Sequence, residues 1–391
     1  MKANAMEASD FRMAGDVARV LVLVGVRPHD VSFRVSSGIV DSDSSFALPL
    51  ALLPAMRVSR ALRIDGSVSP RLLSSISGIQ GLLSDWNLGF HRIPVEARMR
   101  PTRIIPTGRG VAGFFSAGVD SFYSVLRHLD EITDLVFVRD WGVSGVDISS
   151  AVRQAAADLG KPLVQVDTNL QTFSDQYVHW SFYHGAAMAA VALLLSSLFR
   201  KVYLASGMYG ETFPYGSHPR LDPLWSTEHT EIVHDSAEAT RLEKLAVIAE
   251  HDVAMRWLRV CPGADGAYNC GRCEKCLRTM VGLRLVGGLA CCRTFPERLD
   301  LKAISRTWLR PTVRTLWEEN LRAAEERGDD PKLVLALRRS LKGWIWRAIA
   351  RPILRPVRPI RRYFAKRKLR LSVQRGTLTG FSWEVKPSRG R

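Results

Sequence analysis

One short stretch of the chain combines small residues, hydroxyl groups and a carboxylate where an apolar strand is expected to meet a helix. It reads Gly113-Phe-Phe-Ser-Ala-Gly-Val-Asp-Ser121. Small residues at such a junction let backbone N–H groups approach an anion, and the helix N-terminus adds partial positive charge. The stretch therefore predicts a phosphate-binding loop. The residues expected to contact the phosphate there are Ser116, Ala117, Gly118, Val119, Asp120 and Ser121.

This loop differs from two common phosphate-binding motifs. It has neither the Gly-Lys-Ser/Thr ending of a Walker loop nor a dinucleotide fingerprint. On the nucleotide-binding hypothesis, Ser116 and Ser121 supply hydroxyl donors and Asp120 orients a metal ion such as Mg²⁺. The alternative is an ordinary strand-to-helix turn with Asp120 as N-cap, since serine, glycine and aspartate are common at such turns.

Four of the six cysteines follow a metal-binding pattern, C-x8-C-x2-C-x2-C. They are Cys261, Cys270, Cys273 and Cys276. Two-residue spacings let thiolates converge on one tetrahedral ion, and Gly271 relaxes the turn between them, so we expect a closed, structural Zn²⁺ site. An iron–sulfur cluster is the alternative, because thiolate spacing alone does not identify the metal. Cys291 and Cys292 lie outside the pattern and are expected to be buried, small apolar residues.

The loop resembles the Ser-Gly-Gly-x-Asp-Ser signature of the N-type PP-loop ATP pyrophosphatases, with Ala117 in place of the first glycine. That replacement is tolerable if the position keeps φ negative. Together with the cysteine pattern that follows it, the loop resembles most closely the 7-cyano-7-deazaguanine synthase branch of this superfamily. The resemblance covers about residues 110–285 and is divergent: the stretch 206–215 differs from the substrate-reading stretch of those enzymes, and both ends of the chain are foreign to them.

The resemblance implies an enzyme that splits ATP into AMP and pyrophosphate. It would adenylate the carbonyl of an unidentified substrate for attack by a nitrogen nucleophile, in an amidation or nitrile-forming reaction. It implies that Ser206 and Gly207 face the nucleotide from a later strand end, and that Asp120 and Lys244 are catalytic, with Lys244 at the reacting phosphate. The implied cofactors are ATP, Mg²⁺ and Zn²⁺. An RNA-modifying thiolase or amidase, and a non-catalytic nucleotide-binding adaptor, are the alternatives.

Two further groups of residues are weaker candidates. His218, His229 and His234 lie in one polar stretch and could bind substrate or a proton, although solvated loop histidines are commoner. Arg241 and Lys244 share one face of an expected helix, where a solvated face is as common as a phosphate clamp.

Strands and helices are expected to alternate around these motifs. Strands are expected at 111–115, 135–138, 162–166 and 201–205, and helices at 121–129, 149–159 and 177–198. Such alternation predicts an α/β fold with a parallel sheet and helices on both faces, here of the PP-loop, adenine nucleotide alpha hydrolase-like type.

The chain is expected to divide into four parts. They are a small α+β domain (1–101), the ATP-binding domain with the cysteines (102–285), a helical region (286–340) and a basic tail (341–391), with a linker at 103–109. In the first part, strands are expected at 17–26, 32–35 and 61–64, and a helix at 72–86 after an N-cap at Ser69.

Composition and charge favour a globular, cytoplasmic protein with reduced thiols. The 391 residues are 46% hydrophobic and 24% charged, the longest apolar run (186–199) is too short to span a bilayer, and the N-terminus lacks a signal-peptide pattern. Of the formal net charge of +17, residues 341–391 carry +14, from 15 Lys/Arg and one acid. This tail could contact nucleic acid or an anionic membrane, which leaves the substrate of the body undefined. The oligomeric state is left open.

Overall fold

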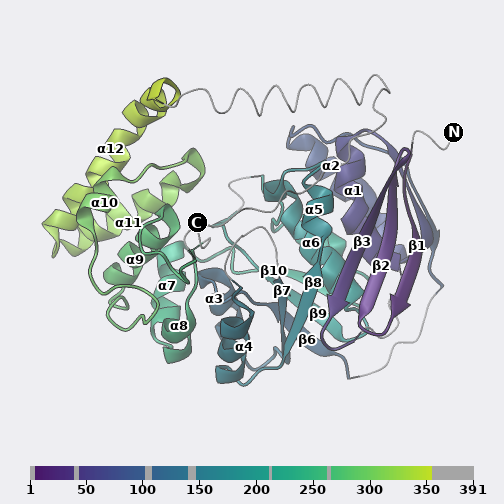
Figure 1. Cartoon of the computed structure of the whole chain (residues 1–391), viewed down its shortest axis with the longest axis horizontal. Helices are drawn as coiled ribbons and strands as arrows, with labels where there is room; N and C mark the ends of the chain where they lie inside the picture. The colour runs from purple at the N-terminus through teal and green to yellow at the C-terminus, as the bar shows by residue number, and fades with distance from the viewer. Residues whose placement is uncertain are drawn as a thin grey trace, which may run out of the picture.

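The computed structural model describes residues 5–38, 44–101, 108–139, 147–210, 214–261 and 266–354. Its strands form one ten-stranded sheet in the order β10-β9-β6-β7-β8-β3-β2-β1-β4-β5. The fold is α/β with a mostly parallel sheet, as predicted from the alternating elements (Figure 1). Among the described helices, none is both long and apolar enough to cross a membrane.

Five parallel strands form the part of the sheet that carries the predicted loop. They are β6 (Gly110–Phe114), β7 (Asp134–Arg139), β8 (Leu163–Thr168), β9 (Phe199–Ala205) and β10 (Glu231–Asp235). The first of them, β6, lies in the middle, with β7 and β8 on one side and β9 and β10 on the other. This order is compatible with a Rossmann-like fold, in which ligands bind outside the carboxyl ends of the strands where the order reverses.

Helices cover both faces of this parallel part. Its connections are α3 (Val119–Arg127), α4 (Ser149–Asp158), α5 (Leu170–Ser174) and α6 (Trp180–Leu194). Leu135 and Phe137 of β7 pack in one hydrophobic core with α3 and α4, whereas Val136 and Val138 pack in another with α6. Successive side chains of a strand point to opposite faces, so both faces are buried. The prediction of helices on both faces is confirmed.

The first hundred residues extend the same sheet. Their strands are β1 (Ala5–Ala14), β2 (Val17–Val24), β3 (Arg27–Val35), β4 (Ala61–Val68) and β5 (Val95–Met99), and their helices are α1 (Ala47–Arg57) and α2 (Pro70–Asp85). Strand β3 pairs antiparallel with β8, and Phe33 of β3 lies in the core that α6 closes. The part predicted as a small α+β domain therefore contains both element types but shares its sheet and core with the next part, because its one apolar sheet face is buried under the same helices.

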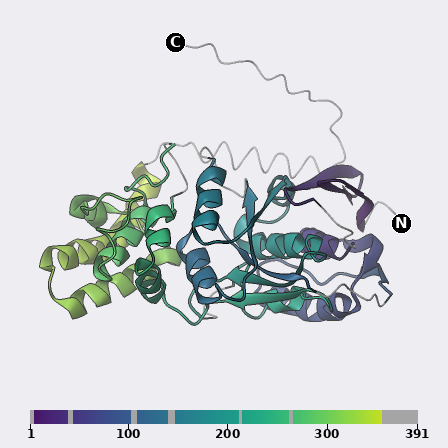
Figure 2. The same cartoon turned by 90° about the horizontal axis from the view of Figure 1, so that it is seen from below.

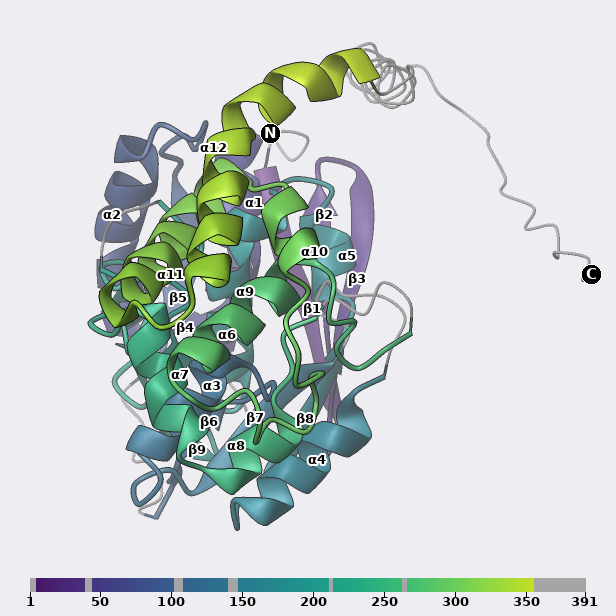
Figure 3. The ribbon, with the colours of Figure 1, turned by 90° about the vertical axis from the view of Figure 1, so that its left-hand side faces the viewer.

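The helices that follow β10 gather at one end of the molecule, opposite the N-terminal strands (Figures 1 and 2). They are α7 (Arg241–Ala249), α8 (Asp252–Trp257), α9 (Glu274–Leu285), α10 (Leu301–Arg306), α11 (Arg314–Arg327) and α12 (Pro331–Leu354). Helix α12 crosses the predicted boundary at 341 and extends outward to Leu354, just before Pro356 (Figure 3). The rest of the basic tail, 355–391, and most of the predicted linker lie outside the described residues.

Gly185 in α6 is expected not to tolerate a side chain. A Cβ at Gly185 would lie 2.0 Å from the backbone oxygen of Gly216, and backbone atoms cannot turn away as a flexible side chain can. Gly185→Ala should therefore lower the free energy of unfolding in urea by about 1–3 kcal/mol. Gly78→Ala in α2 is the matched control, since its Cβ would meet only a Leu224 methyl at 3.8 Å. It should raise stability by about 0.5–1 kcal/mol, and equal effects of the two changes would contradict the packing.

Candidate functional site

The predicted phosphate loop joins β6 to α3 at the carboxyl end of the sheet. The hydroxyl oxygen of Ser121 accepts hydrogen bonds from the backbone N–H groups of Gly118 at 3.0 Å and Ser116 at 3.3 Å. Helix α3 begins at Val119, two residues earlier than predicted, with Gly118 as its N-cap. The loop is thus folded back onto the first turn of the helix, in the strand-to-helix context that the sequence predicted.

Ala117 has a left-handed backbone, with φ of 56°. The condition under which the replacement of glycine by Ala117 is tolerable, a negative φ, is therefore not met. The left-handed conformation costs a residue other than glycine roughly 1–2 kcal/mol, so surrounding contacts must hold it. Ala117 is fully buried, and its carbonyl oxygen accepts a hydrogen bond of 2.8 Å from the backbone N–H of Arg259.

Asp120 lies with the residues predicted from two other parts of the chain. A guanidinium nitrogen of Arg241 lies 3.0 Å from its carboxylate, and Nζ of Lys244 lies 3.3 Å from it. The same Lys244 nitrogen donates to the carbonyl oxygen of Ser206 at 2.7 Å, and Arg241 donates to that of Gly207 at 3.3 Å. The structure thus brings together the loop after β6, the turn after β9 and the first turns of α7.

Burial and charge both act on these groups. Burial opposes ionisation of Asp120, but Arg241 and Lys244 outweigh it, and the pKa of Asp120 is lowered. Burial lowers the pKa of Lys244, and Arg241 adds to the effect against the opposing attraction of Asp120. A positively charged group of side chains therefore surrounds Asp120, an arrangement suited to binding an anion.

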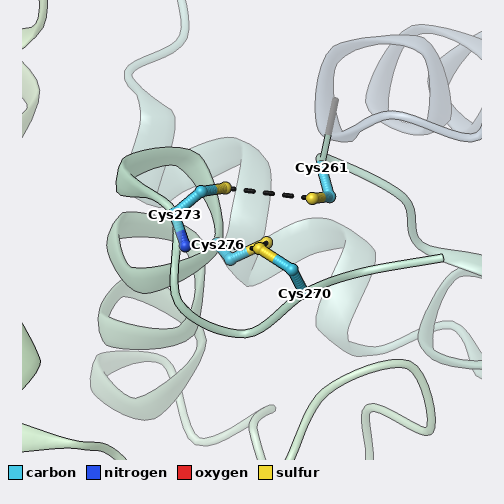
Figure 4. Close-up of side chains that lie close together, drawn as sticks. All are labelled: Cys261, Cys270, Cys273 and Cys276. Atoms are coloured by element: carbon cyan, nitrogen blue, oxygen red, sulfur yellow. Dashed lines mark hydrogen bonds between the residues drawn. The ribbon is translucent and has the colours of Figure 1, made fainter. Parts of the chain in front are cut away.

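The four patterned cysteines converge on one point (Figure 4). The sulfur atoms of Cys261 and Cys273 lie 3.9 Å apart, as do those of Cys270 and Cys276, and all four lie within 4.8 Å of one another. A tetrahedral ion with metal–sulfur bonds of about 2.3 Å holds its ligands about 3.8 Å apart. A multinuclear cluster would place the sulfurs on different metal ions, farther apart. The cysteines therefore fit one tetrahedral metal ion.

The local backbone and thiol chemistry also suit a metal. Gly271 has φ of 67°, so the glycine expected to relax the turn between two ligands adopts a left-handed backbone there. A hydrogen bond from the Cys276 thiol lowers the pKa of Cys273 to about 5 and raises that of Cys276. The site thus favours a thiolate, the form that binds metal. All six cysteines of the chain are free of disulfides; Cys292 is buried as predicted, but Cys291 is exposed, because it lies in a turn at the surface.

Two of the three candidate histidines are interior residues. His218 is 5% exposed, and the side chain of His234 is 2% exposed, so the solvated alternative is wrong for both. Nδ1 of His234 lies 2.7 Å from the carboxylate of Asp222, which also accepts a hydrogen bond of 2.6 Å from Ser217. His229 is half-buried. These histidines are held by structural contacts within the protein rather than displayed in an open loop.

Sequence reasoning missed several residues that hold the two motifs in place. Asn269, next to Cys270, bonds the segment that carries Cys261, and Arg259 bonds the phosphate loop. Their side-chain types carry no signal for these roles.

Comparison with known proteins adds no family to this description. No protein-family model matches the chain, and no curated protein matches its sequence significantly.

Proposed function

We propose that this protein is a divergent PP-loop ATP pyrophosphatase, similar to the 7-cyano-7-deazaguanine synthase branch. It would adenylate the carbonyl of a substrate, releasing pyrophosphate, so that a nitrogen nucleophile can displace AMP in an amidation or nitrile-forming reaction. The observation that carries the proposal is the meeting of Asp120, Lys244 and Ser206 at the point where the strand order reverses. Ligands of open α/β sheets bind at this place.

The chain's own residues would act by binding and charge neutralisation. Backbone N–H groups of the 116–121 loop and the cations of Lys244 and Arg241 would hold the phosphates, and Asp120 would hold Mg²⁺. When bound, Mg²⁺ neutralises charge on the phosphate oxygens. The Asp120 carboxylate already forms ion pairs with both cations. A bound phosphate would therefore pair with cations that are already in position. Such prepositioned charge stabilises a transition state in which negative charge shifts toward the departing pyrophosphate.

The metal of the four-cysteine site is proposed to be zinc with a structural role. All four ligands come from the protein, so a tetrahedral ion has no open position for water or substrate. Nitrogen rather than sulfur transfer is preferred because these thiols are occupied in binding the metal.

Calorimetric titration of the metal-loaded protein tests the nucleotide site. ATP and inorganic pyrophosphate should each bind, and AMP, which lacks the pyrophosphate group, should bind more weakly. If neither ATP nor pyrophosphate binds, the proposal is wrong.

A non-catalytic nucleotide-binding adaptor is the second candidate. It is favoured by the left-handed Ala117, where the signature of the superfamily has glycine. An adaptor would bind ATP but would not cleave it, whichever fraction of cellular metabolites is added as a possible substrate. Contact of the tail with nucleic acid or an anionic membrane stays a prediction for either candidate.

A further inference from the structure

We propose that the metal centre positions the phosphate loop, so that metal binding and nucleotide binding strengthen each other. The inference rests on the proposed nucleotide site. It gives the four cysteines a role in the affinity for ATP, in addition to their role in stability.

The first observation is a direct contact between the two sites. The backbone N–H of Arg259 donates to the carbonyl oxygen of Ala117 at 2.8 Å, and Cys261 follows two residues later on the same segment. A Cβ built on Gly118 would lie 3.7 Å from the carbonyl oxygen of Arg259, so this segment packs directly on the loop. A shift of Cys261 would therefore be felt at Ala117.

The second observation is how the segment is tied to the other ligands. The side-chain oxygen of Asn269 accepts from the backbone N–H groups of Val260 at 3.0 Å and Cys261 at 3.1 Å. Its amide nitrogen donates to the carbonyl oxygen of Leu258 at 2.8 Å. Because Cys270 is the next residue, one side chain joins the first ligand segment to the second. Asn269 is thus a positioning residue, with no contact to the metal or the loop among its hydrogen bonds.

The third observation is that the contacted residue needs to be held. Ala117 is left-handed, a conformation that alanine leaves readily when nothing restrains it. A metal ion that fixes Cys261 fixes the N–H of Arg259, and with it the carbonyl of Ala117. The same ion would fix the first turn of α9, which carries Cys273 and Cys276.

Linkage then makes the effect reciprocal. If the metal raises the affinity for ATP on the order of tenfold, ATP must raise the affinity for the metal by the same factor. Glycine at 117 would adopt the left-handed conformation without support. In the Ala117→Gly variant, the metal should therefore raise the affinity for ATP by a smaller factor, and ATP should raise the affinity for the metal by the same smaller factor.

The test measures metal release from the full-length, metal-loaded protein into a chelating dye, with and without saturating ATP. ATP should slow release on the order of tenfold in the wild type and much less in Ala117→Gly. Lys244→Met, which should not hold ATP, controls for capture of the metal by ATP in solution. In Asn269→Ala, both ATP affinity by calorimetry and metal retention should fall, although this side chain holds only the backbone of the segment between the two sites.

The outcomes separate this inference from the proposed function. If the loaded protein binds ATP but releases metal equally fast with and without it, the linkage is wrong and the nucleotide site stands. If the loaded wild type binds no ATP, the proposed function fails, and the linkage with it. An Ala117→Gly variant with the full wild-type factor would overturn the role given to Ala117.

Discussion

Replacing Lys244 by methionine is expected to lower the affinity for ATP and the rate of pyrophosphate release about 100-fold or more. A cation aimed at phosphate in a buried site contributes about 2.7–4 kcal/mol to charge stabilisation. The Lys244 side chain is only 2% exposed, and its ammonium group lies between Asp120 and the carbonyl of Ser206. Water therefore cannot replace its charge. Calorimetric affinity for ATP, and pyrophosphate release once a substrate fraction is found, measure the loss.

The protein should remain folded in this variant. Methionine fills a similar volume, and Asp120 keeps its ion pair with Arg241, so no carboxylate is left buried and unpaired. Lys201→Met is the matched control: this lysine pairs with Glu131 at 2.8 Å, away from the loop, and its loss should leave ATP affinity unchanged. Wild-type ATP affinity in Lys244→Met would rule out the phosphate-binding role.

Replacing Cys273 by serine is expected to remove the metal and to lower the free energy of unfolding by several kcal/mol, on the order of 5, because the binding free energy of a structural metal is folding free energy. Cys273 is the N-cap of α9, and Cys261 and Cys276 are buried in the core that α3 shares. Loss of the ion leaves these thiols without the partner around which they are arranged. Elemental analysis and urea unfolding report the two effects.

Cys291→Ser is the control for this substitution. Cys291 is exposed and lies outside the cluster, so its replacement should change stability by less than about 0.5 kcal/mol and leave about one metal per chain. Retention of a full equivalent of metal by Cys273→Ser would contradict the four-ligand site. Stoichiometric iron with visible absorbance would contradict zinc.

The parallel part of the sheet could be predicted because local pattern determines it. Apolar runs bounded by glycine and polar turns located β6 to β9 within two residues at each end, and Ser69 caps α2 as expected, accepting from Leu72 at 3.1 Å. Helix α6 was expected to be longer, at 177–198, because residues on both sides of it are apolar too. Strand β10 was not predicted as an element, since it is short and flanked by polar turns, and helix α7 was expected only as the face that carries Arg241 and Lys244.

The single continuous sheet could not be predicted from local pattern. It depends on β3 pairing with β8, residues 33–35 against 166–168, more than a hundred positions apart. Helix α1 was missed for another reason: it is buried from Ala47 to Met56, so it has no amphipathic period, and Pro49 and Pro54 interrupt its alanine- and leucine-rich sequence.

The candidate site also has parts that local sequence pattern predicts and parts that it does not. The cysteine spacing predicted a convergence that the sulfur distances confirm, because two-residue spacings constrain geometry locally. Asp120, Lys244 and Ser206 were expected together only through the family resemblance, and they do lie together. The left-handed Ala117 and its bond from Arg259 were not foreseen, since that conformation arises from a contact across 142 positions, which residue types do not reveal.

Identifying which phosphate bond of ATP is cleaved tests the central claim most directly. ATP carrying one label on the α-phosphate and another on the γ-phosphate is incubated with the metal-loaded protein, Mg²⁺ and fractions of small cellular metabolites, with Lys244→Met as the blank. We expect the active fraction to yield the α-label in AMP or an adenylated intermediate and the γ-label in pyrophosphate. Recovery of the labels in ADP and inorganic phosphate would contradict the central claim, whether or not the Lys244→Met blank consumes ATP at the same rate.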